Sequence, residues 1–119
     1  MYQIVCLMRD WHIIAPNVQF PAYETEHNAT EIVILGKYDT KCVYELHREI
    51  GSDKKYYIMR NDLQGLHLAL PAGFLTTTGT YNLQLRGTYE DGSVKISNEF
   101  KITVNRFIAA EDEDDPEAP

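Results

Sequence analysis

The sequence is short of basic charge and of long apolar stretches, and each shortage excludes a class of protein. Lysine and arginine number 11 against 18 acidic residues, which gives a net charge of −7. That balance argues against a nucleic-acid-binding protein, which needs a basic surface. Apolar runs are only four or five residues long, far below the roughly 20 that a membrane-spanning helix requires. We therefore expect neither nucleic-acid binding nor membrane insertion.

Cysteine is also scarce, and the two cysteines stand far apart. Cys6 and Cys42 lie in apolar segments and form no C-x-x-C motif, so each thiol is expected to act as a small hydrophobe. Residues 1–8 alternate in polarity and are followed at once by charge, which does not resemble a signal peptide. These features favour two reduced thiols and assembly in a cytoplasm, although spacing alone leaves a Cys6–Cys42 bridge open.

Motifs of catalysis and cofactor binding are missing. Serine occurs only at positions 52, 93 and 97, none of them in a G-x-S-x-G motif, and glycine-rich phosphate loops are absent. In a strand, Cys42 and His47 would point to opposite faces, which separates a nucleophile from its base. Glu45 and His47 would share a face, but no third metal ligand has a recognisable spacing. We expect no enzyme activity, no metal and no cofactor.

The negative charge is concentrated at the carboxyl end. Six of the 18 acidic residues lie within residues 111–117, which leaves 12 acidic against 11 basic residues in positions 1–110. A run of like charges that also contains Pro116 and Pro119 cannot bury enough apolar surface to offset its ordering entropy. The sequence therefore predicts a disordered acidic tail over residues 108–119. Its role is solubilising or, alternatively, that of a tether for a basic partner.

Alternating polarity in residues 66–104 predicts β-structure. Apolar residues recur at every second position in segments 66–70, 81–89 and 94–104, a pattern typical of an antiparallel sheet with one wet face. Asp91-Gly92 suits a two-residue type I′ turn between the last two segments. Asn98 falls on the apolar face, which indicates a bulge or a switch between sheets.

The first half of the chain adds further strands. Residues 2–8, 18–20 and 31–35 are extended or β-branched segments. Residues 39–51 fit a helix through Val43, Leu46 and Ile50, or a strand through Cys42, Tyr44 and Leu46. The turn residues at 51–54 and the strand-like segment 56–59 favour the strand. Seven or eight short strands in one domain, residues 1–107, predict an all-β antiparallel sandwich.

One local motif is more specific. Residues 79–85 read G-x-Y-x-L-x-L, which resembles the tyrosine corner of immunoglobulin-like domains. The resemblance implies that the Tyr81 hydroxyl bonds to upstream backbone and that Gly79, Tyr81 and Leu83 serve folding. Leu83 stands where an antibody domain has its second cysteine, so the similarity is to relatives that lack the disulfide.

The order of segments in the last third has a second resemblance. An apolar strand at 66–70, the G-x-Y of 79–81, a charged hairpin, and Ser97-Asn98-Glu99-Phe100 before an alternating strand resemble immunoglobulin-like modules of bacteriophage virions. Such modules occur in upper-baseplate, tail and head-decoration proteins. The resemblance implies a virion protein, assembled in the bacterial cytoplasm, that holds other virion proteins or presents a surface to the host. It implies no catalytic residue.

Aromatic residues are the candidate interface anchors. We single out Trp11, Tyr38, Tyr56 and Tyr57, and note that adjacent tyrosines in a strand must point to opposite faces. The alternative is that these rings cap the open ends of the sandwich. The sequence thus predicts a non-enzymatic interaction protein whose partners are other virion proteins or a second copy. A carbohydrate-binding host-adhesion module and a small acidic inhibitor are the alternatives.

Overall fold

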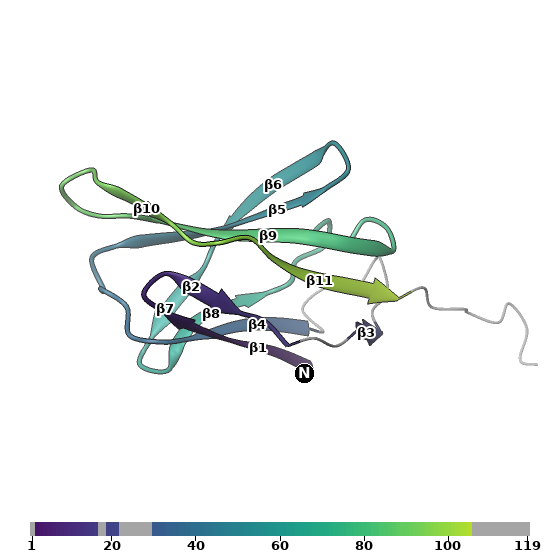
Figure 1. Cartoon of the computed structure of the whole chain (residues 1–119), viewed down its shortest axis with the longest axis horizontal. Helices are drawn as coiled ribbons and strands as arrows, with labels where there is room; N and C mark the ends of the chain where they lie inside the picture. The colour runs from purple at the N-terminus through teal and green to yellow at the C-terminus, as the bar shows by residue number, and fades with distance from the viewer. Residues whose placement is uncertain (1, 17–18, 22–29, 106–119) are drawn as a thin grey trace, which may run out of the picture.

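The computed structural model describes residues 2–16, 19–21 and 30–105, and every regular element within them is a strand. The strands form two layers (Figure 1). Sheet A contains β1 (Tyr2–Arg9), β2 (His12–Ile14), β4 (Thr30–Leu35), β7 (Arg60–Asp62) and β8 (Gly65–Ala69). Sheet B contains β3 (Gln19–Pro21), β5 (Val43–Ile50), β6 (Asp53–Ile58), β9 (Gly79–Thr88), β10 (Val94–Ile96) and β11 (Phe100–Asn105).

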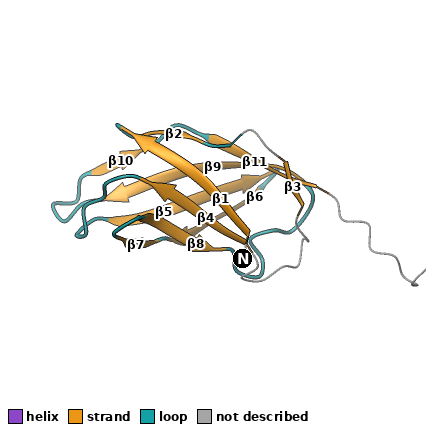
Figure 2. Ribbon diagram, turned by 90° about the horizontal axis from the view of Figure 1, so that it is seen from below, coloured by secondary structure: helices purple, strands orange, loops and turns teal. Residues whose placement is uncertain are grey.

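The all-β, two-layer architecture is confirmed, but its strands are not all antiparallel. Sheet A has the order β2-β1-β4-β8-β7, seen side by side in Figure 2, and sheet B has the order β3-β11-β9-β5-β6, with β10 also on β9. The pairs β1–β4 and β3–β11 are parallel, and the others are antiparallel. Eleven strands are described where seven or eight were predicted, because β2 and β7 were not predicted and the predicted segment 94–104 is divided into β10 and β11.

The core lies between the sheets and is filled by alternate residues, as the polarity pattern predicts. The prediction of one sheet through residues 66–104 is wrong, however, because the loop after β8 carries the chain from sheet A to sheet B. Leu66, Leu68 and Leu70 therefore face Tyr81 and its neighbours across the core instead of pairing beside them. The remaining buried side chains include Ile4, Ile13, Ile32, Ile34, Leu46, Leu83, Leu85, Phe100, Ile102 and Val104.

Asn98 marks a bulge, as one of the two sequence interpretations holds. Ile96 lies opposite Arg86 and Phe100 opposite Leu83, so that three residues on one strand oppose two on the other. The extra residue reverses which face later side chains occupy. Val94 and Ile96, expected in the core, are thus 40% and 56% exposed on the outer face, whereas Phe100 is buried.

The turn after β9 also differs from its prediction. The Gly92 N–H donates to Tyr89 O at 2.9 Å and the Tyr89 N–H donates to Ser93 O at 2.9 Å, which encloses a three-residue loop. Only Gly92, with φ of 86°, has left-handed backbone there. Glu90 therefore joins Asp91 and Gly92 in a loop of the three-residue hairpin type, and the predicted two-residue type I′ turn is wrong.

Residues 43–50 form strand β5, in agreement with the preferred interpretation of the ambiguous segment. The inward side of β5 continues past Leu46 to Arg48, whose side chain is fully buried. Its guanidinium donates to Phe74 O at 2.7 Å and to the Asp53 carboxylate at 3.0 Å. It also lies 5.4 Å from the centre of the Tyr81 ring. Arg48 therefore fixes the loop that joins the two sheets.

Both cysteines are free thiols in the core. Cys6 is fully buried and Cys42 is 6% exposed. Burial raises the pKa of Cys6 to about 12, and burial is also the main cause of the raised pKa of Cys42. Thiols in such surroundings are inert as nucleophiles.

Two sequence predictions concern residues that the structure does not describe. The acidic tail over 108–119 and the domain end at residue 107 both lie outside the described part of the chain. Within that part, the structure has no helix of the length and apolar character that a membrane crossing requires.

Candidate functional site

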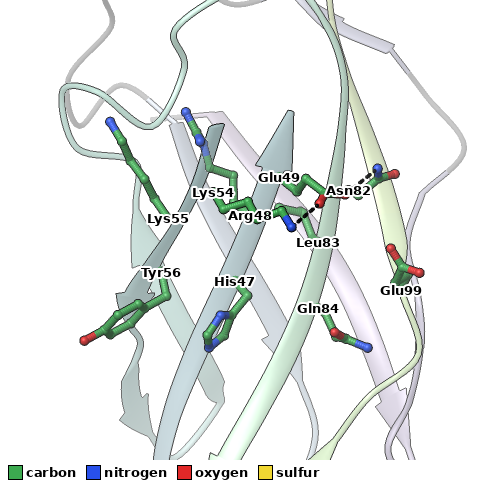
Figure 3. Close-up of a pocket in the computed structure, with 10 residues that line it drawn as sticks. All are labelled: His47, Arg48, Glu49, Lys54, Lys55, Tyr56, Asn82, Leu83, Gln84 and Glu99. Atoms are coloured by element: carbon green, nitrogen blue, oxygen red, sulfur yellow. Dashed lines mark hydrogen bonds and ion pairs between the residues drawn. The ribbon is translucent and has the colours of Figure 1, made fainter. Parts of the chain in front are cut away.

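The outer face of sheet B carries a shallow hollow of about 300 Å³ over strands β5, β6 and β9 (Figure 3). The side chains that point outward from these strands give it a mixed polar and aromatic lining. It is lined by His47, Arg48, Glu49, Lys54, Lys55, Tyr56, Asn82, Leu83, Gln84 and Glu99. Arg48 and Leu83 belong to the floor, because their side chains are buried in the core.

An aromatic pair forms one wall of the hollow. His47 and Tyr56 are register partners on β5 and β6, and their rings stack at 5.3 Å with an interplanar angle of 21°. Tyr56 is 58% exposed, whereas Tyr57 points inward and packs on Phe74 at 5.1 Å. Of the two adjacent tyrosines, Tyr56 is therefore the one available to a partner.

The polar wall is held by contacts among its own side chains. Glu49 receives a hydrogen bond from Asn82 Nδ2 at 3.4 Å and forms an ion pair with Lys54 Nζ at 3.4 Å. Gln84 donates to Ser97 O at 2.9 Å, which ties the wall to the bulge. Carboxylate, amide and ammonium groups thus lie in fixed positions beside the ring of Tyr56, as hydrogen-bonding groups for a polar ligand.

A metal centre is not formed by this lining. His47 Nε2 lies 3.0 Å from Glu45 Oε1, so the two residues share a face as predicted. Across the described residues, no group of three or more His, Cys, Asp or Glu side chains is arranged to hold a metal ion.

Beside the hollow, the outer face of sheet B exposes a set of apolar side chains. One row across β6, β5, β9 and β10 has an apolar residue at each end and two charged residues between them, in the order Ile58, Glu45, Arg86 and Ile96. In the next row, Val43 on β5 and Val94 on β10 lie on either side of Thr88 on β9. These apolar residues are all more than one-third exposed. We call Val43, Tyr56, Ile58, Val94 and Ile96 the sheet B patch.

The outer face of sheet A exposes a second apolar set at its β2 edge. Leu7 and Ile14 are register partners in the β1–β2 hairpin, and Val5 lies two residues before Leu7 on the same face. Their exposed fractions are 55%, 61% and 43%. Val5, Leu7 and Ile14 are the sheet A patch, on the face of the sandwich opposite the sheet B patch (Figure 1).

Next to the sheet A patch lies a charged cluster that the sequence analysis missed. His67 is almost buried on the outer face of β8, with Nε2 3.0 Å from Asp62 Oδ1 and Nδ1 3.5 Å from Glu31 Oε1. Arg60 contacts Asp62 at 3.2 Å and Glu31 at 4.0 Å. Backbone hydrogen bonding from Gln64 is the main cause of the lowered pKa of Asp62, with His67 contributing. The cluster joins β4, β7 and β8, and no local motif in the sequence signals it.

Trp11 and Tyr38, two of the four predicted interface anchors, pack against the core. The Trp11 ring stacks on Tyr44 at 6.1 Å, and Tyr38 meets the same ring edge-on at 5.1 Å. Trp11 also covers Gly87, where a Cβ would lie 2.6 Å from the indole. This placement matches the end-capping alternative, so Tyr56 is the anchor candidate with the most exposed ring.

The residues of the predicted tyrosine corner lie at the start of β9. The Tyr81 hydroxyl accepts hydrogen bonds from Thr76 N at 3.1 Å and Thr77 N at 3.0 Å, and it donates to Thr77 O. Tyr81 and Leu83 are fully buried, and Gly79 has φ of 131°. These contacts connect Tyr81 to the loop before β9, and Tyr81 and Leu83 both pack in the core.

Similarity to known proteins adds no family to these observations. No protein-family model matches the chain, and no curated protein matches it significantly. The candidate site is therefore defined by geometry: an aromatic and polar hollow beside one apolar patch, and a second patch on the opposite face.

Proposed function

We propose that this chain is a non-enzymatic structural protein that acts through protein–protein contacts in a bacteriophage particle. One observation carries the proposal: both outer faces of the sandwich expose apolar side chains. The sheet B patch and the sheet A patch lie on opposite faces. Exposed apolar sets of this kind mark interaction surfaces. A protein with one on each face can bind two neighbours at once, as a building component of a particle must.

The phage assignment is supported by the sequence resemblance of residues 66–104 to immunoglobulin-like virion modules. The two-layer all-β fold is compatible with that resemblance. Buried free thiols are compatible with assembly in a reducing cytoplasm. In this proposal the core supplies rigidity, and the patches supply the contacts.

The experiment is to measure how much of the chain enters purified particles of a phage that encodes it. We expect the double variant Ile58→Asp/Ile96→Asp to enter at one-tenth of the wild-type level or less, because charge in an apolar contact is costly to desolvate. Leu63→Asp is the matched control, since Leu63 is fully exposed in the β7–β8 turn, outside both patches. Equal incorporation of both variants, each shown to be folded, would contradict a role for the sheet B patch.

A second candidate function, carbohydrate binding at a host surface, is favoured by the hollow itself. Tyr56 offers an exposed ring beside Glu49, Asn82 and Gln84, and sugars bind by stacking on a ring while their hydroxyls meet carboxylates and amides. Glycan-array binding that survives Tyr56→Phe but is lost in Tyr56→Ala would establish it. An array without signal for the wild-type chain would remove this candidate.

A further inference from the structure

We propose that strand β6 pairs with β6 of a second copy of this chain, antiparallel, about a two-fold axis at Tyr56. β6 is the last strand of sheet B, and the β5–β6 hairpin projects away from the sandwich (Figure 1). Lys54, Lys55, Tyr56 and Ile58 are exposed along it. The pairing would join two sheets edge to edge and bring two sheet B patches onto one continuous face.

No strand in the described part of the chain pairs with the outer edge of β6. The Met59 N–H donates to Tyr44 O at 2.9 Å, in the same register that pairs Tyr57 with Leu46. Odd-numbered residues of β6 therefore direct their N–H and C=O groups toward β5. The N–H and C=O groups of Lys54, Tyr56 and Ile58 point the other way, where an added strand would meet them.

The length of β6 distinguishes it from the other edges. The edge strands β2, β3 and β7 span three residues each, and so does β10, whereas β6 spans six. Proteins that avoid edge-to-edge association keep their edge strands short, charged or covered. β6 is thus the described edge with enough length to form a ladder.

The placement of charges along β6 allows two copies to pair and favours one register. With Tyr56 opposite Tyr56, Lys54 lies opposite Ile58 and no like charges meet. A shift of two residues in one direction places Lys55 opposite Lys55, and the same shift in the other direction leaves only residues 56–58 of each β6 in the pair. Like charges directly opposite each other destabilise a strand pair. The register centred on Tyr56 is therefore the one that pairs residues 54–58 of both copies without placing like charges opposite each other.

The two lysines of β6 do not protect the edge as free charges would. Lys54 forms an ion pair with Glu49 at 3.4 Å, and Lys55 donates to Gly73 O at 3.4 Å. Both side chains are thus directed toward their own chain, one over the outer face and one toward the loop between the sheets.

Oxidative cross-linking of single-cysteine additions tests the register in the purified full-length chain. Residues directly opposite in a hydrogen-bonded antiparallel pair have Cα atoms about 5.5 Å apart, within the range of a disulfide. We expect Tyr56→Cys to form a covalent dimer, and a mixture of Lys54→Cys with Ile58→Cys to do the same. Ile58→Cys alone should not, because its two copies would lie roughly 14 Å apart. The unsubstituted chain, in which Cys6 and Cys42 are buried, is the control for background cross-linking.

Failure of Tyr56→Cys to cross-link, or equal cross-linking of Ile58→Cys alone, would overturn the proposal. So would a Lys54→Cys and Ile58→Cys mixture that stays monomeric, since the register would then be wrong. These tests use the isolated chain, so they can fail while the proposed role in a particle holds, and particle incorporation can fail while they succeed.

Sedimentation equilibrium separates backbone pairing from contact through the ring. Tyr56→Pro removes the ring and also an N–H that faces away from β5, at a position where an edge strand tolerates proline. We expect it to raise the dimer dissociation constant at least tenfold, and Tyr56→Thr, which keeps the N–H, to raise it less. Equal effects of the two variants would contradict edge pairing, and a wild-type chain that is monomeric at all concentrations would overturn the proposal.

Discussion

Gly87 and Trp11 form a pair whose interdependence can be measured. A Cβ on Gly87 would lie 2.6 Å from Trp11 Cη2 and 3.1 Å from Cys42 Sγ, so Gly87→Ala requires the indole to move by about 1 Å to reach an ordinary contact distance of about 3.5 Å. The indole is not free to move, because it stacks on Tyr44. Overpacking of this kind costs roughly 1–3 kcal/mol, which corresponds to a fall in Tm of roughly 5–15 °C.

The same substitution should be harmless once the indole is gone. Trp11 has φ of 61° and Asp10 has φ of 51°, as a type I′ turn requires, and glycine is the residue that such a turn favours at the second position. Trp11→Gly therefore removes the ring without straining the backbone. In that background Gly87→Ala should be close to neutral, because Cys42 Sγ at 3.1 Å must yield only slightly and alanine loses less entropy on folding than glycine does.

Urea unfolding of the wild type, the two single variants and the double variant provides the double-mutant cycle. A coupling energy of about 1.5–3 kcal/mol is expected, with Gly87→Ala changing from destabilising to neutral. An equal cost of Gly87→Ala in both backgrounds would refute the packing of Trp11 on β9.

Three further predictions concern stability. Tyr81→Phe removes the hydroxyl that accepts hydrogen bonds from Thr76 N and Thr77 N, so urea unfolding should show that the free energy of unfolding falls by about 1–3 kcal/mol. An unchanged urea midpoint would contradict these contacts. The Asn98 side chain accepts a hydrogen bond from Ile13 N at 2.6 Å and donates one to Ile13 O at 3.0 Å. Asn98→Asp keeps the shape of this side chain but removes the donor, so thermal unfolding should show that the free energy of unfolding falls by about 1–2 kcal/mol. The control variant Glu99→Gln should not cause this fall. The Arg48 hydrogen bond is the main cause of the lowered pKa of Asp53. That carboxylate therefore stabilises the fold above about pH 4 and loses its effect as the pH falls below, so Asp53→Asn should flatten the acid limb of a stability–pH curve. An acid limb of unchanged slope would argue against the pair.

The sequence predicted the strands and layers better than their pairing. Period-two polarity placed Leu66, Leu83 and Phe100 correctly in the core, because burial of alternate side chains is a local property of a strand. Which sheet each strand joins depends on contacts between distant residues, and so residues 66–70 were assigned to the wrong partner strands. Ile96 was misplaced because one extra residue in the bulge reverses the faces, although Asn98 gave a signal of that bulge.

The candidate site was predictable only in part. Adjacent Tyr56 and Tyr57 had to point to opposite faces, but which one is exposed depends on the register with β5. The burial of Arg48 could have been predicted, since the strand alternation of Tyr44 and Leu46 continues to it, although a charged side chain is seldom fully buried. The cluster of Glu31, Asp62 and His67 could not have been predicted, because its members lie on three strands that only the fold brings together.

Quantitative mass spectrometry of purified particles, from a phage whose genome encodes this chain, tests the proposed role most directly. A component that joins neighbours through both faces should be present at a fixed ratio to the major structural proteins and should remain after extensive washing. Recovery of the folded chain only from the lysate supernatant, with none in the particles, would contradict that role.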